Sequence, residues 1–508
     1  MNENVTVAMV LAGPWVAVLA SAIAGRLGRS GDLVARIAAA VVGLGFVFTA
    51  AVAVAVSTLW TGSIQVGFGE TSLQLDALAL IMSMLVLGLS SLIQGFAVRY
   101  LRGDPRQVWF VVTANLLTGF TVLMVCAGSV ALFACAWVGA GAALVLLLAT
   151  YWPLAQAREG VWRTAVRFGA ADTAFLLAVA VLLVGAGGDV SFDQLGAGAS
   201  GLSAPAQLTL AVMLVLAALA RSSQIPFQGW LPFTLGAPTP VSALLHAGVV
   251  NAGAILLLRF APAIAPHRSV MIVVCVVGAA TLVFASAVRL ARPDVKGRLV
   301  FSTMAQMGFM IMACGLGLFA AAIFHLVAHS LYKSTLFLGA GTGVRQHATD
   351  RDLPTRTAPS RLVAGLAVAI SVTVTVAVLV AAKLVLSPAV SPSSIGLLAF
   401  VALTAGVTLA VALATHFSIR TMVVGTTVTA AVGIGYVAFL HLFTGALEPG
   451  VPVQGAPGWL LVLPAVGLIA VELLARSSTG AVWLRDRVYT SALAASLPRN
   501  PIRTGAPL

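Results

Sequence analysis

Long runs of apolar residues alternate with short polar segments along the whole chain. A helix needs about 20 apolar residues to cross a bilayer, so each run of that length predicts a membrane-spanning helix. Fifteen runs meet this requirement, at residues 6–25, 33–57, 73–97, 108–128, 130–151, 164–187, 205–234 (broken), 239–260, 268–290, 298–316, 318–343, 361–386, 394–415, 421–443 and 457–476. The longest polar loop, residues 344–361, is too short to fold as a separate domain.

The composition supports an all-α polytopic membrane protein with about 15 transmembrane helices. Of its 508 residues, 60% are hydrophobic and only 8% are charged, whereas a soluble protein carries about 25% charged residues. The net charge of +13 would suggest nucleic-acid binding in a soluble protein. In a membrane protein, basic residues instead gather in cytoplasmic loops that face anionic membrane lipid, so we expect no nucleic-acid partner.

The distribution of basic residues among the loops predicts the orientation. The first, third, fifth, ninth and eleventh loops and the tail are basic, with Arg26, Arg29, Arg99, Arg102, Arg106, Arg158, Arg163, Arg292, Lys296, Arg298, Arg345, Arg351, Arg356, Arg476, Arg485 and Arg487. Only the loop near His267 and Arg268 blurs the alternation. The loops between them are poor in Lys and Arg and contain Glu70, Asp189, Asp193 and Glu448. The positive-inside rule places the N-terminus outside and the C-terminus in the cytoplasm, as in a multi-pass protein of a bacterial inner membrane.

Two regions follow from these patterns. Residues 1–476 form the predicted transmembrane bundle, and residues 477–508 form a cytoplasmic tail. The tail is mildly amphipathic around residues 482–493, which is typical of a segment that lies on the membrane surface or on a partner. A disordered tail is an equally good interpretation.

The stretch from Arg221 to Arg259 is unusual for an apolar protein. It opens on a charge and contains four prolines, a histidine and an asparagine. Lipid offers no hydrogen bonds to the backbone, so a segment broken by proline persists at membrane depth only where it lines a protein cavity. A matching spacing links Arg221 to Pro226 and Lys383 to Pro388, five residues in each case. We interpret it as an inverted-topology repeat with broken helices, the pattern of ion-coupled transporters.

The segment FHLVAHSLYKSTLF places three ionisable residues at regular helical spacing. His325, His329 and Lys333 stand at i, i+4 and i+8, so they share one helix face and form a ladder about 12 Å long. Histidine titrates near neutral pH, which suits proton relay. A lone membrane histidine would more often be a packed, hydrogen-bonded residue, but a row of three favours an ion pathway.

Further polar residues extend this candidate pathway. We assign His246, which follows the broken stretch, a place in it, and we expect Asn251 to form a hydrogen bond between helices. Asp172 is a lone acid in the run 164–187, where a loose ion pair with Arg167 at the membrane interface is the alternative reading. Asp76 begins a helix and is expected to interact with its dipole.

Motifs of catalysis and cofactor binding are missing from the chain. It contains no Walker loop, HExxH motif or paired Cys cluster, and these are the signatures of nucleotide and metal sites. We therefore expect no enzymatic activity, no metal site and no cofactor in this chain.

Three segments resemble the antiporter-like membrane subunits of respiratory complex I and of Mrp cation/proton antiporters. They are QIPFQGWLP…PTPVSALLHAG, DVKGRLVFSTMAQMGFM and FHLVAHSLYKSTLFL. Within that superfamily, HAGVVNAGAILLLRFAP, AHSLYKSTLFLGAG and RYLRGDPRQ are most similar to the membrane subunit of dissolved-inorganic-carbon accumulating (DAB) complexes. This resemblance implies that proton or cation flow energises bicarbonate or CO2 uptake. It also implies a large peripheral cytoplasmic partner that is related to β-carbonic anhydrases and holds the zinc.

The sequence departs from the wider family at several positions. Arg221 stands where the family usually has Lys, and Arg remains charged in proteins whereas a buried Lys can lose its proton. The Glu that pairs with that lysine in complex I subunits is missing from residues 130–151, and the Arg expected three residues before Asp172 is Gly169.

In this reading His325, His329, Lys333 and His246 relay protons. Arg221 is a fixed charge and Lys383 is its second-half counterpart.

Two alternatives remain open at this stage. The chain could instead be a proton- or sodium-translocating subunit of a complex I-like or Mrp-type assembly. It could also be a degenerate, non-conducting anchor for a peripheral enzyme, a reading favoured by Arg221 and the missing acids.

Overall fold

The computed structural model is almost entirely helical. It describes residues 3–59, 64–68, 71–292, 294–341, 361–386, 418–447 and 453–476, with single residues or pairs between 398 and 413 and between 486 and 494. The first half contains α1 (Glu3–Arg26), α2 (Gly31–Leu59), β1 (Ile64–Phe68), β2 (Thr71–Leu75), α3 (Ala77–Tyr100), α4 (Gln107–Val125), α5 (Val130–Leu148), η1 (Ala149–Tyr151), α6 (Ala155–Ala186), η2 (Phe192–Gln194), α7 (Leu195–Ser200) and α8 (Ala204–Arg221).

The second half begins with short, interrupted helices and continues with long ones. Its elements are η3 (Gln228–Gly236), α9 (Thr239–Ala247), η4 (Val249–Asn251), α10 (Ala252–Arg259), α11 (Ala261–Ile264), α12 (Arg268–Ala291), α13 (Val295–Gly315), α14 (Phe319–Leu338), α16 (Arg361–Leu386), α18 (Ile419–Leu447), η5 (Gly458–Leu461) and α19 (Val462–Arg476). The antiparallel pair β1 and β2 is the only named sheet in the described part of the chain.

The predicted helical membrane fold is confirmed. Eleven of the fifteen predicted segments coincide with helices that are long and apolar enough to cross a membrane. The helices α13 and α14 lie at predicted positions, but polar residues such as Gln306, His325 and Lys333 lower their hydropathy. The segment at 457–476 forms the short helices η5 and α19. The segment 394–415 and the tail 477–508 lie outside the continuously described residues.

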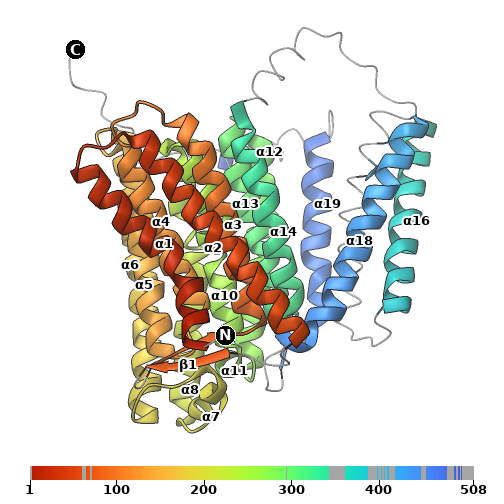
Figure 1. Cartoon of the computed structure of the whole chain (residues 1–508). Coiled ribbons are helices and arrows are strands. Elements are labelled where there is room, and N and C mark those ends of the chain that lie inside the picture. Colours follow the sequence, from red (N-terminus) through yellow and green to blue (C-terminus); the bar gives the residue numbers. More distant parts are fainter. Residues whose placement is uncertain are drawn as a thin grey trace.

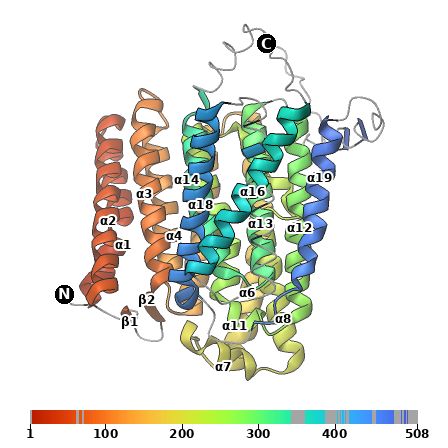
Figure 2. The ribbon, with the colours of Figure 1, turned by 90° about the vertical axis from the view of Figure 1, so that its right-hand side faces the viewer.

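Most of the helices run side by side along one common direction (Figures 1 and 2). The first six helices form one side of the bundle, α12, α13 and α14 lie in the middle, and α16, α18 and α19 lie on the other side. α14 contacts both α9 and α18, so it joins the two sides. This central position places the predicted ladder inside the protein.

Glycines bring α12 and α13 into contact through their backbones. A Cβ added at Gly278 would lie 2.5 Å from the backbone nitrogen of Met312, and one at Gly308 would lie 2.6 Å from that of Leu282. Small residues permit this close approach in membranes, where van der Waals packing holds helices together. α12 and α13 therefore form a tightly fitted pair.

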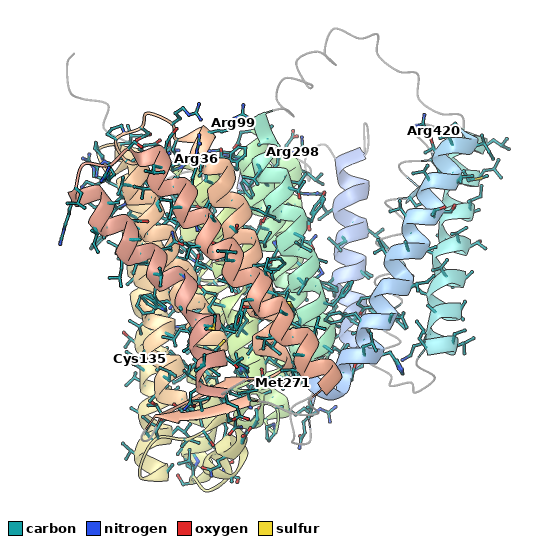
Figure 3. The ribbon with its side chains drawn as sticks, in the orientation of Figure 1. Arg36, Arg99, Cys135, Met271, Arg298 and Arg420 are labelled. Carbon is teal, nitrogen blue, oxygen red and sulfur yellow. The ribbon has the colours of Figure 1, made fainter. Side chains whose placement is uncertain are left out.

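Arginines gather at one end of the bundle (Figure 3). Arg36, Arg99, Arg298 and Arg420 lie at this end, which we call the arginine end, and Met271 lies toward the other. Such a separation is what the predicted orientation requires, with the arginine end in the cytoplasm.

Candidate functional site

The chain breaks after α8 as the proline-rich sequence predicts. Arg221 is the last residue of α8, and Ser223 follows in a left-handed conformation with φ 55°. The freed carbonyl groups at the break find side-chain donors, because the Trp230 indole donates to the Ala220 carbonyl at 3.1 Å. The Ser222 hydroxyl donates to the Val250 carbonyl at 2.8 Å. The backbone carbonyl groups at the break thus find hydrogen-bond donors within the protein, as they must at membrane depth.

A second interruption lies between α9 and α10. The chain leaves the α-helix at Gly248 and passes through the 3-10 turn η4 before α10 begins at Ala252. His246 stands in the last turn of α9, and Asn251 ends η4. Both residues are fully buried. The two successive helix interruptions therefore place polar side chains in the interior of the bundle.

Arg221 forms a buried ion pair with Asp172 of α6. The two side chains approach to 2.6 Å between Nη2 and Oδ1, and Arg221 is 1% exposed. The same guanidinium donates to the Trp137 carbonyl at 3.0 Å, and the Trp137 indole donates to Asp172 at 2.8 Å. The guanidinium lies over the rings of Trp137 and Phe168, at 4.3 and 4.2 Å. This arrangement compensates a charge that would otherwise be costly in the membrane.

This ion pair corrects one sequence-based expectation and explains a departure from the wider family. Asp172 pairs with Arg221 and not with Arg167. The acid that faces the α8 cation therefore comes from α6, whereas α5 contributes the Trp137 indole and carbonyl. α5 also leaves room for the cation, because a side chain at Gly141 would overlap the Arg221 guanidinium.

The predicted ladder lies on the inward face of α14. His329 is 4% exposed and Lys333 is 1% exposed, while His325 is half-buried. The Lys333 ammonium donates to the Ser302 hydroxyl at 2.8 Å and to the Leu299 carbonyl at 3.3 Å, both on α13. No acidic residue pairs with Lys333 in the described part of the chain. Lys333 is thus a buried ammonium whose hydrogen-bond partners on α13 are neutral.

The two ladder histidines stack in sequence along α14. Their ring centroids are 6.1 Å apart with an interplanar angle of 19°, which places the rings beyond direct hydrogen-bond contact. The ring of Phe309 lies 4.6 Å from that of His325. Proton transfer between the two rings would therefore pass through an intervening water.

His246 joins the ladder from α9. Its ring stacks on Phe337 of α14 with centroids 4.6 Å apart and an interplanar angle of 5°. Phe337 stands one turn beyond Lys333 on the same helix. The structure thus brings His246 next to the Lys333 end of the ladder, as the candidate pathway requires.

Asn251 forms the expected hydrogen bond between helices. Its side-chain amide donates to the Ser330 hydroxyl of α14 at 2.9 Å, and both residues are buried. Because Ser330 is adjacent to His329, this bond links η4 to the middle of the ladder.

Replacing Asn251 with leucine is expected to lower the free energy of unfolding by about 1 kcal/mol, because it removes a buried interhelical hydrogen bond without changing the side-chain volume much. Thermal unfolding of the detergent-solubilised chain would measure the change. Thr335→Val is the matched control, because Thr335 is exposed and bonds only within its own helix. Equal melting temperatures of the two variants would show that the Asn251 hydrogen bond does not stabilise the fold.

Lys383 belongs to α16, whereas the ladder residues belong to α14. It lies half-buried in the last turn of α16, as expected from its place at the end of an apolar run. Pro388, on which the repeat with Arg221 and Pro226 depends, lies outside the described residues. The role of Lys383 as a second-half counterpart stays a prediction.

A second buried ion pair was not predicted from the sequence. Arg259 of α10 forms two hydrogen bonds with Asp76 and a third, at 2.7 Å, with the Val125 carbonyl. Asp76 also caps α3 by accepting from the Ala79 backbone at 2.8 Å, which confirms its expected role at a helix start. The capping position was visible in the sequence, but its partner lies 183 residues away.

Among the described residues, no group of three His, Cys, Asp or Glu side chains could hold a metal ion. The candidate site is therefore a chain of imidazole, ammonium and guanidinium groups with hydroxyl and carbonyl partners.

Comparison with known proteins gives two family matches. Residues 127–385 match the transmembrane family of NADH:quinone oxidoreductases and Mrp antiporters. Residues 61–111 match the N-terminus of complex I chain 5. The first match covers the broken helix, the candidate ladder and α16.

Relatives are found among carbon transporters and respiratory enzymes. The chain is 39% identical, over 54% of its length and 50% of the relative, to a probable inorganic carbon transporter subunit, DabB1, of Halothiobacillus neapolitanus. It is 34% identical to NADH-quinone oxidoreductase subunit L of Mycobacterium tuberculosis, over 58% of its length and 46% of the relative. The chain therefore spans about half the length of these curated relatives.

Solved structures share the fold. A chain of the Mrp complex from Dietzia superposes with a TM-score of 0.63 at 22% identity, covering 97% of this chain and 59% of that one. A chain of an archaeal membrane-bound sulfane sulfur reductase superposes with a TM-score of 0.59 at 17% identity, covering 96% and 97%.

Proposed function

Because the chain belongs to the NADH:quinone oxidoreductase/Mrp antiporter membrane family, we propose that it translocates protons, or another cation, to energise inorganic carbon uptake. The uptake itself would take place together with a peripheral, zinc-containing partner. The chain is then an integral membrane subunit without catalytic residues of its own. We place it in a bacterial inner membrane, with its N-terminus outside and its C-terminus in the cytoplasm.

The observation that supports translocation most directly is the buried row of titratable groups on α14. Lys333 and His329 are almost fully buried, and His246 reaches the same region from α9. Ionisable residues are costly inside a membrane and are retained there mainly for ion pathways. In this proposal His325, His329, Lys333 and His246 relay protons. Arg221 and Asp172 set the electrostatic field around these groups. Lys383 would have the role of Arg221 in the second half of the inverted repeat.

The assignment to carbon uptake rests on similarity. The relative named as a carbon transporter subunit is 39% identical over the matched region, and the quinone oxidoreductase subunit is 34% identical. The partner would be a large cytoplasmic protein related to β-carbonic anhydrases.

The proposal is tested by replacing both ladder histidines, His325→Gln and His329→Gln, in a strain whose growth in air depends on this system. Growth in ambient CO2 is expected to fail and to recover at elevated CO2, because the relay would lose two of its titratable groups. His441→Gln is the matched control, since His441 is exposed on α18. Undiminished growth of the double variant at normal expression would exclude the relay.

A redox-driven or Mrp-type assembly is the second candidate function. It is favoured by the similarity to NADH-quinone oxidoreductase subunit L and by the superposition on a chain of an Mrp complex. Purification from the native membrane distinguishes the two, because carbon uptake predicts co-elution of one large zinc protein. Co-elution of quinone-oxidoreductase subunits or of several small antiporter subunits would favour this alternative.

A non-conducting membrane anchor is the third candidate. It is favoured by the Arg221–Asp172 pair, in which both charges are already compensated. Proton flux into liposomes that contain this chain and its co-purified partner separates the readings. An anchor predicts flux no greater than that of empty liposomes.

A further inference from the structure

A cavity of about 740 Å³ lies beside the ladder. Its wall is formed by side chains from α12, α13, α14, α16, α18 and α19. Most of this wall is apolar and includes Leu282, Phe309, Phe324, Leu379 and Val432. A cavity lined in this way favours an apolar occupant over a column of water.

Polar side chains of α12 and α13 line one side of the same cavity, and His325, Thr375, Thr429 and Tyr436 add polar groups from the other helices. Ser286 and Arg289 stand one turn apart on α12, and Ser302 and Gln306 stand one turn apart on α13. Arg289 belongs to the last turn of α12, which ends beside the start of α13 at the arginine end. The cavity thus combines an apolar interior with hydrogen-bond donors near the level of the lipid headgroups.

Arg289 is an exposed arginine that lines this cavity. It makes no hydrogen bond or ion pair with another residue that the structure describes. The described residues that line the cavity include no Asp or Glu. An anion in the cavity would therefore be attracted to Arg289 without competition from an acidic side chain of this lining.

We propose that this cavity binds one anionic phospholipid. Its phosphate lies at Arg289 and Ser286, and an acyl chain lies along the apolar wall toward Phe324 and Val432. Basic pockets between transmembrane helices on the cytoplasmic side are known binding sites for anionic headgroups.

The dimensions of the helices agree with this occupant. Arg289 lies seven residues beyond Leu282 on α12, which corresponds to about 10 Å along the helix. Ser302 and Phe309 have the same separation on α13. The polar and apolar parts of the wall are therefore spaced like the headgroup and the first part of an acyl chain. The inference does not depend on ion translocation, because it concerns lipid binding alone.

Native mass spectrometry of the full chain, purified in detergent with phosphatidylglycerol or phosphatidylcholine of the same acyl length, tests the proposal. We expect the chain to retain one phosphatidylglycerol under conditions that remove phosphatidylcholine. Arg289→Gln should reduce this retention about fivefold, as expected for losing one basic residue at a lipid headgroup. Arg289→Lys should preserve it.

Two further variants distinguish binding of the headgroup from binding of the acyl chain. Arg298→Gln is the matched control, because Arg298 is exposed at the arginine end and does not line the cavity. It should bind lipid like the unaltered chain. Ala321→Phe fills the apolar part and should lower retention although Arg289 is intact. Thermal unfolding confirms that each variant is folded.

Two outcomes would overturn the proposal. Equal retention of phosphatidylglycerol by the unaltered chain and by Arg289→Gln would show that Arg289 does not bind a headgroup. Displacement of the lipid by inorganic phosphate or bicarbonate, at constant ionic strength, would identify a site for a small free anion instead.

Discussion

Replacing Asp172 with asparagine is expected to lower the free energy of unfolding by about 3 kcal/mol or more. The substitution leaves the Arg221 guanidinium buried without a counter-charge, and breaking a buried pair by removing one partner costs about 3–5 kcal/mol. Arg221 is 1% exposed and Asp172 17% exposed, so solvent offers little compensation. Thermal or denaturant unfolding of the chain in detergent would measure the loss.

A double variant distinguishes the ion pair from a general packing defect. Asp172→Asn combined with Arg221→Met removes both charges, so it should be more stable than Asp172→Asn alone. Asp32→Asn is the matched control, because its partner Arg102 is 58% exposed and such surface pairs contribute about 0–1 kcal/mol. If Asp172→Asn proved no more harmful than Asp32→Asn, the pair would not be holding a buried charge.

Replacing Lys333 with arginine is expected to reduce proton flux about 100-fold in liposomes that contain the chain and its partner. Arginine keeps the positive charge but does not release its proton in proteins. Loss of a proton-transferring group typically costs a factor of about 100 or more. Lys333→Met should show the same loss, since it removes the charge and the proton together. The measurement is the rate of pH change inside the liposomes after a potential is applied.

The control for this prediction is Lys296→Arg. Lys296 lies half-buried near the start of α13 and donates to the Ala237 carbonyl at 3.3 Å. It is outside the ladder, so flux should be unchanged. If Lys333→Arg retained normal flux, Lys333 would act as a fixed charge, and the relay would have to proceed through the histidines alone.

The sequence predicted most of the fold because membrane helices have a strong local signal. A run of about 20 apolar residues is sufficient to locate a membrane-spanning helix. Pro226 and Pro240 indicated the broken region near Arg221. The helices α13 and α14 were found by the same pattern, although they are not among the eleven apolar candidate spans. The polar residues of α14 include His325, His329 and Lys333 of the candidate pathway.

The candidate site was predictable where its residues share one helix. The ladder on α14 follows from the spacing of His325, His329 and Lys333, because residues four apart lie on the same face. The pairs that hold the site together join distant helices instead. Asp172 lies 49 residues from Arg221, and Asp76 lies 183 residues from Arg259. Such partners are set by how the helices pack, and no local pattern in the sequence records them.

The backbone contact between α12 and α13 also has a mechanical consequence. Gly278 and Gly308 leave no gap at this crossing, so the two helices cannot slide or part without losing direct backbone packing. The wall that bears Arg289 and Ser302 is consequently stiff. A change in the width of the cavity would therefore require movement of the helices on its other sides, such as α16 and α18.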